Sequence, residues 1–366
     1  MGDDPTVVAG RKCLKCDLPA LYYSVNPKQA VYCKDCFMSM VLHKFKFALG
    51  SNKIFKGNAS KKVILLYKPG SDADDYMVQV VKEETERVGQ HNRLPAEPEV
   101  LVISEVVKDE ELKSMLNVVR QQLSNFEISW PVKFIHLSEV FKQDIQFVTD
   151  EYRIEERHGS LLKYLFQKSA AKSDKMELKR LLSDLLMYRV AKKLGIDKVM
   201  VSDTADITAQ NIFNAICFGR GASMSQLSSV IDTRFPGLSI IRPLREIFLS
   251  DVKLIMRLKK SVEQGLENLS VNQVQIKSKS SVQDYNLQEL TRLQTSGFPS
   301  TFTNVIQTAS KVKSIINPEA TQPCCICLEN TDEKDFCGAC DRVFTAVPGF
   351  PDELRNFLSQ KWQQST

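Results

Sequence analysis

Short apolar runs separated by longer amphipathic segments dominate the middle of the chain. Runs of this length, rich in Val, Ile and Leu, are typical of buried strands. Apolar positions that recur every three or four residues between the runs indicate helices. The predicted strands are 61–67, 99–104, 132–137 and 196–201. Because strands and helices alternate at these lengths, the pattern predicts an α/β fold with a doubly wound parallel sheet.

The predicted helices have recognisable ends. Ser71 and Asp72 follow a Pro-Gly turn and are expected to cap the first helix, and a second helix is predicted over 108–124. The longest helix is predicted from about Asp174 to Leu194, where Gly195 suits the left-handed position beyond a helix end. The apolar positions are Tyr76, Val80, Val81 and Val88 in the first helix and Leu178, Leu181, Leu182, Leu185 and Ala191 in the longest.

Beyond the fourth strand the same pattern continues. A helix that carries the apolar residues Ile212, Phe213 and Ile216 is expected to end at the glycine turn 219–221. The segments that follow are a strand and a helix within 241–262, a polar linker over 263–284, and a final helical region over 285–315.

Four cysteines near the N-terminus form two CxxC pairs. The pairs are separated by sixteen residues, and each places two thiols on one tight turn. Two such pairs give one Zn²⁺ the four thiolates of a closed tetrahedral site. We therefore predict a structural zinc site at Cys13, Cys16, Cys33 and Cys36.

A second cysteine cluster lies near the other end of the chain, in the sequence Cys324-Cys325-Ile-Cys327 and the pair Cys337-Gly-Ala-Cys340. It offers five thiols for the four positions of a zinc site. The predicted ligands are Cys324, Cys327, Cys337 and Cys340, with Cys325 as the alternative to Cys324. Two structural zinc sites would then bracket the α/β core.

The length of 366 residues exceeds that of a typical single domain. We expect a zinc-knuckle module over 1–60, the α/β domain over 61–262, a linker and helical region over 263–320, and a second knuckle module over 321–366. No run of eighteen apolar residues occurs, and the first residues lack the features of a signal peptide, which predicts neither a membrane span nor secretion. Cysteines paired as CxxC in such a chain favour metal over disulfides.

The net charge of +5 is distributed unevenly. Residues 1–62 carry eleven Lys and Arg against four Asp and Glu, and the stretch from His43 to Lys62 has six lysines and no acidic residue. A basic segment of this kind predicts contacts with a phosphate backbone. The alternative is a solvated lysine face with no ligand.

The turn after the first strand decides whether the sheet could bind a nucleotide. Phosphate-binding turns need glycines, so that backbone N–H groups can approach the phosphates, and a helix N-terminus. The segment Tyr67-Lys-Pro-Gly-Ser-Asp-Ala-Asp-Asp75 has one glycine, a proline with no N–H group, and three carboxylates that repel phosphate. We predict a capped turn with no phosphate. In the alternative, Asp72, Asp74 or Asp75 holds Mg²⁺.

Two further residues have a structural and a chemical interpretation. Cys217 lies among apolar neighbours and is predicted to be a buried, inert thiol, with a sulfur carrier as the alternative. His43 follows the second cysteine pair and could be an alternate metal ligand. Because four cysteines already fill that site, a surface position in the basic segment is preferred.

Several motifs in a fixed order resemble one family, the cytoplasmic tRNA 2-thiolation protein 2 family. They are Cys13-Leu-Lys-Cys16; Cys33-Lys-Asp-Cys36-Phe37 leading into His43-Lys-Phe-Lys-Phe-Ala-Leu-Gly50; Cys217-Phe-Gly-Arg-Gly-Ala222; Ile241-Arg-Pro-Leu-Arg-Glu246; and the C-terminal cysteine cluster. This family is the non-catalytic partner of a wobble-uridine thiolase and is related to the PP-loop ATP pyrophosphatases. The resemblance therefore implies a PP-loop-like (adenine nucleotide alpha hydrolase-like) sheet.

The chain departs from the catalytic members of that superfamily at three places. Their Ser-Gly-Gly-x-Asp-Ser loop is here Lys68-Pro-Gly-Ser-Asp-Ala73, without the double glycine. Their CxxC pair before the central helix is replaced by Ser169-Ala-Ala-Lys-Ser-Asp174, and their Gly-His-Asn-x-Asp-Asp segment by Val201-Ser-Asp-Thr-Ala-Asp206. These losses imply that the chain has no catalytic residues of its own for adenylation or sulfur transfer.

The resemblance implies a cytoplasmic, tRNA-binding subunit that pairs with a catalytic thiolase as a heterodimer. It would support 2-thiolation of the wobble uridine in tRNAs for Lys, Glu and Gln, with sulfur from a thiocarboxylated ubiquitin-like carrier. ATP would bind to the catalytic partner. One alternative is an active ATP-dependent tRNA sulfurtransferase with a diverged loop, and another is a zinc-knuckle protein adaptor with no role on RNA.

Five basic residues are predicted to contact tRNA or the partner subunit. Two come from the basic N-terminal segment, and three follow predicted strands or helices at the carboxyl edge of the sheet, where an ancestral nucleotide or tRNA would lie. They are Lys44, Lys46, Arg220, Arg242 and Arg245. For the arginines, ion pairs with Glu246 or Asp251 are the alternative.

Overall fold

The computed structural model describes residues 8–264, 281–312 and 322–358, apart from 27, 29, 58, 88, 90–92, 107, 170, 332–334, 349–354 and 357. Val88 and most of the predicted linker 263–284 lie outside these residues. None of the helices in the described ranges has both the length and the hydrophobicity that a membrane crossing requires.

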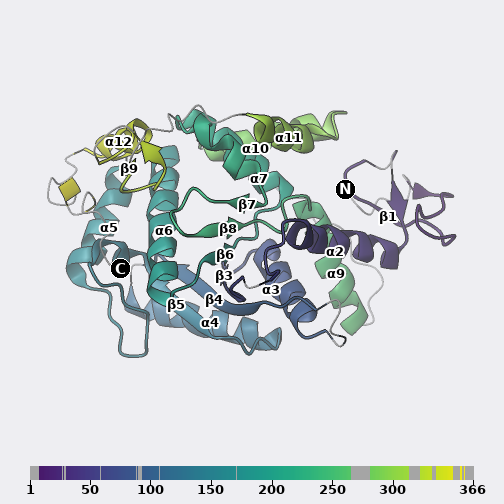
Figure 1. Ribbon diagram of the computed structural model, residues 1–366, viewed down its shortest axis with the longest axis horizontal. Coiled ribbons are helices and arrows are strands. Elements are labelled where there is room, and N and C mark those ends of the chain that lie inside the picture. Colours follow the sequence, from purple (N-terminus) through teal and green to yellow (C-terminus); the bar gives the residue numbers. More distant parts are fainter. Residues whose placement is uncertain are drawn as a thin grey trace.

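A six-stranded sheet forms the centre of the molecule, in the order β5–β4–β3–β6–β8–β7 (Figure 1). All neighbouring strands pair in parallel except β7, which is antiparallel to β8 at the edge. The strands are β3 (Lys62–Leu66), β4 (Glu97–Ser104), β5 (Val132–His136), β6 (Lys198–Met200), β7 (Ile231–Asp232) and β8 (Ser239–Ile241). The four strands predicted from apolar runs are confirmed. The strand predicted at the start of the 241–262 segment lies two residues earlier, at Ser239–Ile241.

The main helices follow the predicted alternation. They are α3 (Asp72–Thr85), α4 (Asp109–Asn125), α6 (Lys172–Leu194), α7 (Ala205–Cys217), α9 (Leu249–Gln264), α10 (Val282–Thr295) and α11 (Thr301–Lys311). Two predicted ends are confirmed in detail. The Ser71 hydroxyl accepts a hydrogen bond from the Asp74 N–H at 3.3 Å, and Gly195 ends α6 with a φ of 64° in the left-handed region.

The sheet is buried on both faces, as a parallel sheet requires. On β3, Ile64 packs into the hydrophobic cluster of α6, whereas Val63 and Leu65 on either side of it pack into the cluster of α3 and α9. The chain runs from β3 outward to β4 and β5, and then returns to β6 on the other side of β3. The sheet is therefore doubly wound, and its topological switch point lies between the carboxyl ends of β3 and β6.

The basic N-terminal segment forms a helix that the sequence analysis did not predict, α2 (Lys34–Ser51). Its residues Phe37, Val41 and Phe45 lie four apart and are fully buried, in the same hydrophobic cluster as α3 and α9. The predicted module 1–60 thus shares a core with the sheet, and its boundary stays a prediction. The shorter elements are α5 (Glu156–Lys168), α8 (Met224–Ser228), α12 (Gly338–Thr345), the hairpin β1 (Tyr22–Tyr23) with β2 (Val31–Tyr32), and β9 (Gln322–Pro323) with β10 (Asn330–Thr331).

Candidate functional site

A cavity of about 190 Å³ lies at the topological switch point. The residues that follow β3 and β6 line it, together with one face of α6 and the turn after α7. This is the position at which open parallel sheets bind ligands. Apolar and charged side chains share the wall, and the charged ones include Lys68, Glu177, Arg180, Asp203, Arg220, Arg234 and Arg242.

In the turn after β3, a backbone N–H group donates a hydrogen bond to a carboxylate of the same chain. The N–H of Lys68 donates to Oδ1 of Asp74 at 3.2 Å, and the Asp74 side chain is buried. Burial raises the pKa of this carboxyl, against the lowering effect of Ser71 and Lys68. In a phosphate-binding turn such an amide would face a phosphate oxygen. Here the carboxylate of Asp74 takes the place of that phosphate oxygen.

The two neighbouring carboxylates have different partners. Asp75 accepts hydrogen bonds from the Tyr67 hydroxyl at 2.7 Å and from Nε2 of Gln122 at 2.8 Å. Asp72 is exposed, and its carboxylate lies 4.0 Å from the Lys253 ammonium group. Within the described residues, two sets of side chains have ligand atoms close enough to hold one metal ion, and both are the cysteine clusters. These aspartates do not form such a set.

A buried network of ion pairs closes the far side of the cavity. Arg242 pairs with Asp203 at 3.1 Å and with Asp232 at 2.9 Å, and Arg234 pairs with Asp232 at 2.7 Å and Glu329 at 2.6 Å. Asp232 is completely buried. Burial raises its pKa, but the two guanidinium groups outweigh that effect and hold the pKa well below its usual value.

The three arginines predicted to contact tRNA or a partner have partners within the chain. Arg220 is buried and pairs with Glu177, and the Arg242 pairs are described above. Arg245 is the least enclosed of the three and lies 3.7 Å from Glu246, as the alternative interpretation expected. Arg220 and Arg242 also form ion pairs, but with Glu177, Asp203 and Asp232 in place of the expected Glu246 or Asp251. Contact with tRNA or a partner stays a prediction for all three.

The N-terminal cysteine cluster joins the first loop to α2. Cys13 and Cys33 are buried, and Cys33 is the residue before the first turn of α2. The Sγ atom of Cys16 lies 3.6 Å from that of Cys33 and 3.7 Å from that of Cys36. The N–H of Lys15 donates to the sulfur of Cys13 at 3.4 Å. All four sulfur atoms lie within 4.8 Å of one another.

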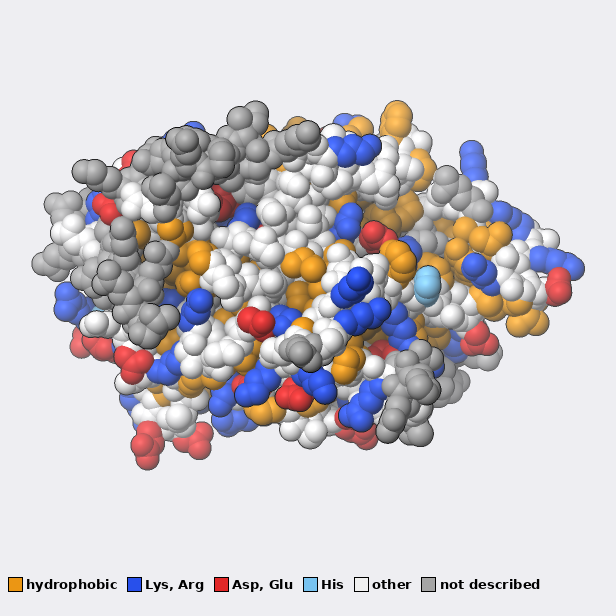
Figure 2. Space-filling view, viewed as in Figure 1, with side chains coloured by type: hydrophobic (Ala, Val, Ile, Leu, Met, Phe, Trp, Pro, Cys, Tyr) orange, Lys and Arg blue, Asp and Glu red, His pale blue; other side chains and the backbone are white. Residues whose placement is uncertain are grey.

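His43 lies on the exposed side of α2, outside the cysteine cluster, in agreement with the preferred interpretation. Its ring centroid is 6.1 Å from that of Phe47, which is 59% exposed. Lys44 donates to the Glu246 carbonyl at 3.0 Å, and Lys46 pairs with Glu84 at 2.6 Å. Figure 2 shows Lys and Arg side chains gathered over the region of α2 and α3. The exposed lysines of the segment are Lys53, Lys56, Lys61 and Lys62.

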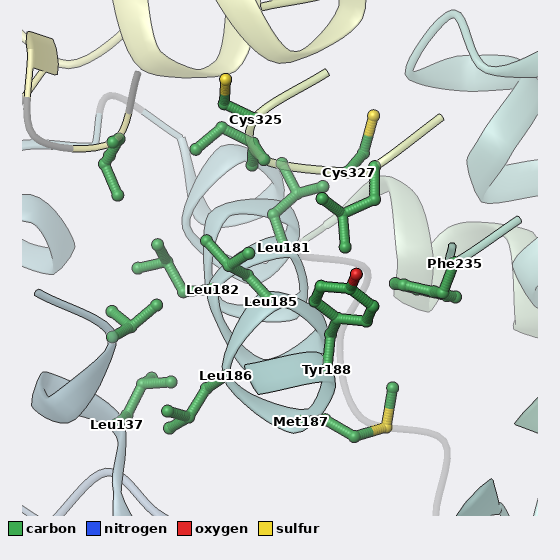
Figure 3. Close-up of a cluster of buried hydrophobic side chains, with 14 of the residues drawn as sticks. Leu137, Leu181, Leu182, Leu185, Leu186, Met187, Tyr188, Phe235, Cys325 and Cys327 are labelled. Atoms are coloured by element: carbon green, nitrogen blue, oxygen red, sulfur yellow. The ribbon is translucent and has the colours of Figure 1, made fainter. Parts of the chain in front are cut away.

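The C-terminal cysteine cluster is part of the main core. Its four sulfur atoms, from Cys324, Cys327, Cys337 and Cys340, also lie within 4.8 Å of one another, and Cys324 and Cys340 are completely buried. Figure 3 shows Cys325 and Cys327 above the leucine-rich face of α6. Cys325 is buried but is not one of the four grouped sulfurs, so the geometry selects Cys324 from the two candidates.

Both clusters fit a tetrahedral metal site. With Zn–S bonds of about 2.3 Å, the sulfur atoms of such a site are roughly 3.8 Å apart. The separations in the N-terminal cluster and the 3.7 Å between Cys327 and Cys337 are close to this value. The two clusters lie at opposite ends of the long axis, near β1 and α12 (Figure 1).

Cys217 was predicted to be buried, and this prediction is wrong. The thiol is exposed at the end of α7, where the buried positions are Ile212 and Ala215 and the neighbouring Ile216 is also exposed. Asn286 on α10 lies 3.8 Å from the sulfur. Of the apolar neighbours that suggested burial, Ile212 is buried, but Phe213, one helical turn before Cys217, is only partly buried.

The acids that balance the buried arginines were not among the predicted site residues. One signal was present, because Glu177 is flanked by Met176 and Leu178 and falls on the apolar side of α6. A carboxylate at such a position needs a buried cationic partner. The identity of that partner depends on tertiary packing, and no local pattern points to Arg220 or Asp232.

These features define a PP-loop-like α/β protein with two four-cysteine clusters that could hold metal ions. A solved structure described as U34-tRNA thiolase NcsA from Methanococcus maripaludis with its [4Fe-4S] cluster has a similar fold. The TM-score is 0.60 at 17% identity, and the match covers 92% of this chain and 97% of that chain. The expected fold is confirmed.

Proteins named cytoplasmic tRNA 2-thiolation protein 2 are similar to this chain over most of its length. The protein of that name from Caenorhabditis elegans is 26% identical over 346 residues, which cover 94% of this chain and 96% of the relative. Cytoplasmic tRNA 2-thiolation protein 2-B from Xenopus laevis is 23% identical, over 96% of this chain and 77% of the relative. No family model matches the chain. The resemblance predicted from the sequence is thereby confirmed.

Proposed function

We propose that this chain is a non-catalytic, tRNA-binding subunit of a cytoplasmic tRNA thiolation complex. It would support 2-thiolation of the wobble uridine of tRNAs for Lys, Glu and Gln. The observation that carries the non-catalytic part is the hydrogen bond from the Lys68 N–H to the buried Asp74 carboxylate. At the place where a catalytic relative must hold phosphate, this chain holds its own negative charge.

The surroundings of that bond support the same conclusion. The first turn of α3 carries Asp72, Asp74 and Asp75, which interact favourably with the helix dipole and oppose a phosphate group. Ser71 caps the helix and satisfies one of the N–H groups that would otherwise face a ligand. ATP therefore belongs on a catalytic partner, which would form a heterodimer with this chain. Sulfur would reach that partner from a thiocarboxylated ubiquitin-like carrier.

Zinc is the proposed metal at both cysteine clusters. Four thiolates and no open position are typical of structural zinc, which links chain segments and stabilises the fold without reacting. The N-terminal ion would fix the first loop against α2, and the C-terminal ion would fix the last segment against α6.

The proposed tRNA surface is the exposed side of α2 and the lysines that follow it. Lys53 and Lys56 are exposed, and no acidic residue occurs between His43 and Lys62 to oppose a phosphate backbone. Phe47 and His43 offer exposed rings on which an unpaired base could stack. Lys44 and Lys46 lie along the same helix and would complete this positive surface.

We expect the isolated chain to show no ATP turnover, because its first turn has no free phosphate cradle. With the catalytic partner present, Asp72→Asn should support thiolation at the wild-type rate, since the exposed Asp72 has only a long contact with Lys253. Formation of 2-thiouridine in tRNA, measured by mass spectrometry, tests this. ATP turnover by the isolated chain, together with a large loss of thiolation in Asp72→Asn, would favour the active sulfurtransferase instead.

We expect tRNA affinity to fall steeply with salt and to depend on the α2 surface. The double variant Lys53→Glu, Lys56→Glu should weaken binding about tenfold and reduce the slope of log K against log salt by about 1–2. Its control is Lys113→Glu, Lys163→Glu, which makes the same charge change on exposed positions of α4 and α5. Binding titrations at several salt concentrations measure both. Salt-independent binding, or an equal loss in the control, contradicts the proposal and favours a protein adaptor.

A further inference from the structure

A guanidinium group lies directly against the C-terminal cysteine cluster. Nη2 of Arg220 is 3.4 Å from the Sγ atom of Cys340, and both side chains are buried. Nη1 of the same guanidinium group pairs with Oε1 of Glu177 on α6. One planar group therefore connects a sulfur of the cluster to the longest helix of the core.

The charge of a filled cluster explains why a cation is needed there. Four thiolates around one divalent cation carry a net charge of −2, and a buried charge is costly unless it is paired or hydrogen-bonded. Two backbone N–H groups also donate to these sulfurs, from Cys337 to Cys324 at 3.3 Å and from Cys340 to Cys337 at 3.4 Å. Those groups supply dipoles, whereas Arg220 supplies a full positive charge.

The N-terminal cluster provides a comparison within the same molecule. Its Cys16 is exposed, so water can stabilise the charge of that cluster. The hydrogen bond described at Cys13 comes from a backbone N–H, that of Lys15. The two clusters therefore have the same ligands and different surroundings.

The backbone around Arg220 is shaped to bring the cluster close. Gly219 has a φ of 75°, and a Cβ atom there would lie 2.1 Å from Nη2 of Arg342 on α12, the helix that carries Cys340. The backbone conformation therefore disfavours a side chain at position 219, whereas the guanidinium group of Arg342 is the end of a flexible side chain that could move aside. The turn after α7 thus lies beside the cysteine-bearing helix, with Gly219 next to Arg342 and Arg220 next to Cys340.

We propose that Arg220 is a positioning residue for the metal of the C-terminal cluster, and that it couples this metal to the core through Glu177. The proposal rests on the proposed zinc occupancy and is independent of tRNA binding. Glu177 also accepts from Arg180, at 3.0 Å from Nε and 2.7 Å from Nη2, and Arg180 lines the switch-point cavity. A line of charged contacts thus runs from the metal cluster to the carboxyl edge of the sheet.

Arginine is required in this role because its rigid fork donates in two directions at once. Lysine retains the charge, but its single ammonium group cannot replace the two separate guanidinium nitrogens that contact Cys340 and Glu177. Arg220→Lys should therefore retain part of the stabilisation of the metal cluster, because it keeps the positive charge. Arg220→Gln removes that charge.

The test measures zinc release from the zinc-loaded, full-length chain to a coloured chelator. Groups that hydrogen-bond to metal ligands contribute about 10–100-fold in metal affinity. We expect Arg220→Gln to release zinc from the C-terminal cluster about 10–100-fold faster, with Arg220→Lys between it and the wild type. Zinc release from the N-terminal cluster should not change. The variants Cys13→Ser and Cys324→Ser, each lacking one cluster, show which kinetic phase of zinc release comes from which cluster.

Two controls separate positioning from a general loss of stability. Arg189→Gln removes another buried arginine, whose Nη1 donates to the Val140 carbonyl at 3.0 Å, and it should leave zinc release unchanged. In the cobalt-loaded chain, Arg220→Gln should shift the thiolate-to-cobalt absorption band, because one sulfur loses a charged hydrogen bond. Arg220→Lys serves as the folded variant if Arg220→Gln fails to fold.

The possible results separate the role of Arg220 from the proposal that the C-terminal cluster binds zinc. Wild-type release rates and an unchanged cobalt spectrum in Arg220→Gln and Arg220→Lys would overturn the role of Arg220 and leave zinc binding intact. A wild-type chain that binds no metal at the C-terminal cluster would overturn both the Arg220 role and the proposed zinc at that site. Neither result depends on tRNA or on the catalytic partner.

Discussion

Replacing Cys324 with serine should reduce the zinc content of the chain from two ions to one and lower its melting temperature substantially. The reason is that the C-terminal cluster lies within the same hydrophobic core as α6. Binding free energies of structural zinc are about 10–16 kcal/mol in zinc-finger peptides. With an unfolding entropy of about 2.1 cal/mol/K per residue, the loss of about 4 kcal/mol lowers the Tm of a 366-residue chain by roughly 5 °C. Metal analysis and thermal unfolding measure the two effects.

The adjacent residue provides a matched control. Cys325 is also buried, but its sulfur is not among the four that group together. Cys325→Ala should therefore keep both zinc ions and show only the modest cost of a small cavity. If Cys325→Ala lost a zinc ion while Cys324→Ser kept it, the assignment of the fourth ligand would be reversed. If neither change altered the metal content, the cluster would not be a zinc site.

Asp232→Asn should destabilise the protein by about 3–5 kcal/mol at neutral pH, because it leaves two buried arginines without their shared carboxylate. The measurement is the free energy of unfolding in denaturant. Asp197→Asn is the control, because Asp197 is exposed and its pair with Lys198 at 2.9 Å should contribute about 0–1 kcal/mol. Equal effects of the two changes would contradict the importance of the buried network.

The same variant should show a defined dependence on pH. Despite the opposing effect of burial, Arg234 and Arg242 lower the pKa of Asp232 below its ordinary 3.8 in the folded state. A lowered folded pKa stabilises the protein above the unfolded pKa, and that stabilisation is lost as the pH falls toward the folded value. The difference between wild type and Asp232→Asn should therefore be constant near neutrality and should narrow below about pH 4. A difference that widened in acid would contradict the assignment.

Much of the fold could be predicted because it rests on local patterns. The run from Val63 to Leu65 is apolar at every position, as a strand buried on both faces requires. Ser71 and Gly195 mark helix ends through chemistry that is visible in the sequence. The two-residue strand β7 was missed because it is too short to show any period.

The remaining features depend on contacts between distant segments. Helix α2 was not predicted, because the lysines after the second cysteine pair were interpreted as a basic segment. Phe37, Val41 and Phe45 nevertheless have the spacing of a buried helical stripe. The choice between Cys324 and Cys325 depends on which way each side chain points. The charges of Arg220 and Arg242 suggested an external ligand. Both residues are buried against acids on other elements, Glu177 and Asp232, which no local pattern identifies.

The packing of the C-terminal cluster against α6 has a consequence for the synthesis of the protein. Leu181, Leu182 and Leu185 are fully buried, and the cluster that covers them includes residues 324–328, which a ribosome adds more than a hundred positions later. A nascent chain that already contains the complete sheet would still lack this part of the cover over the leucine-rich face. We therefore expect the core to close only late in translation, when the last cysteines emerge and can bind metal.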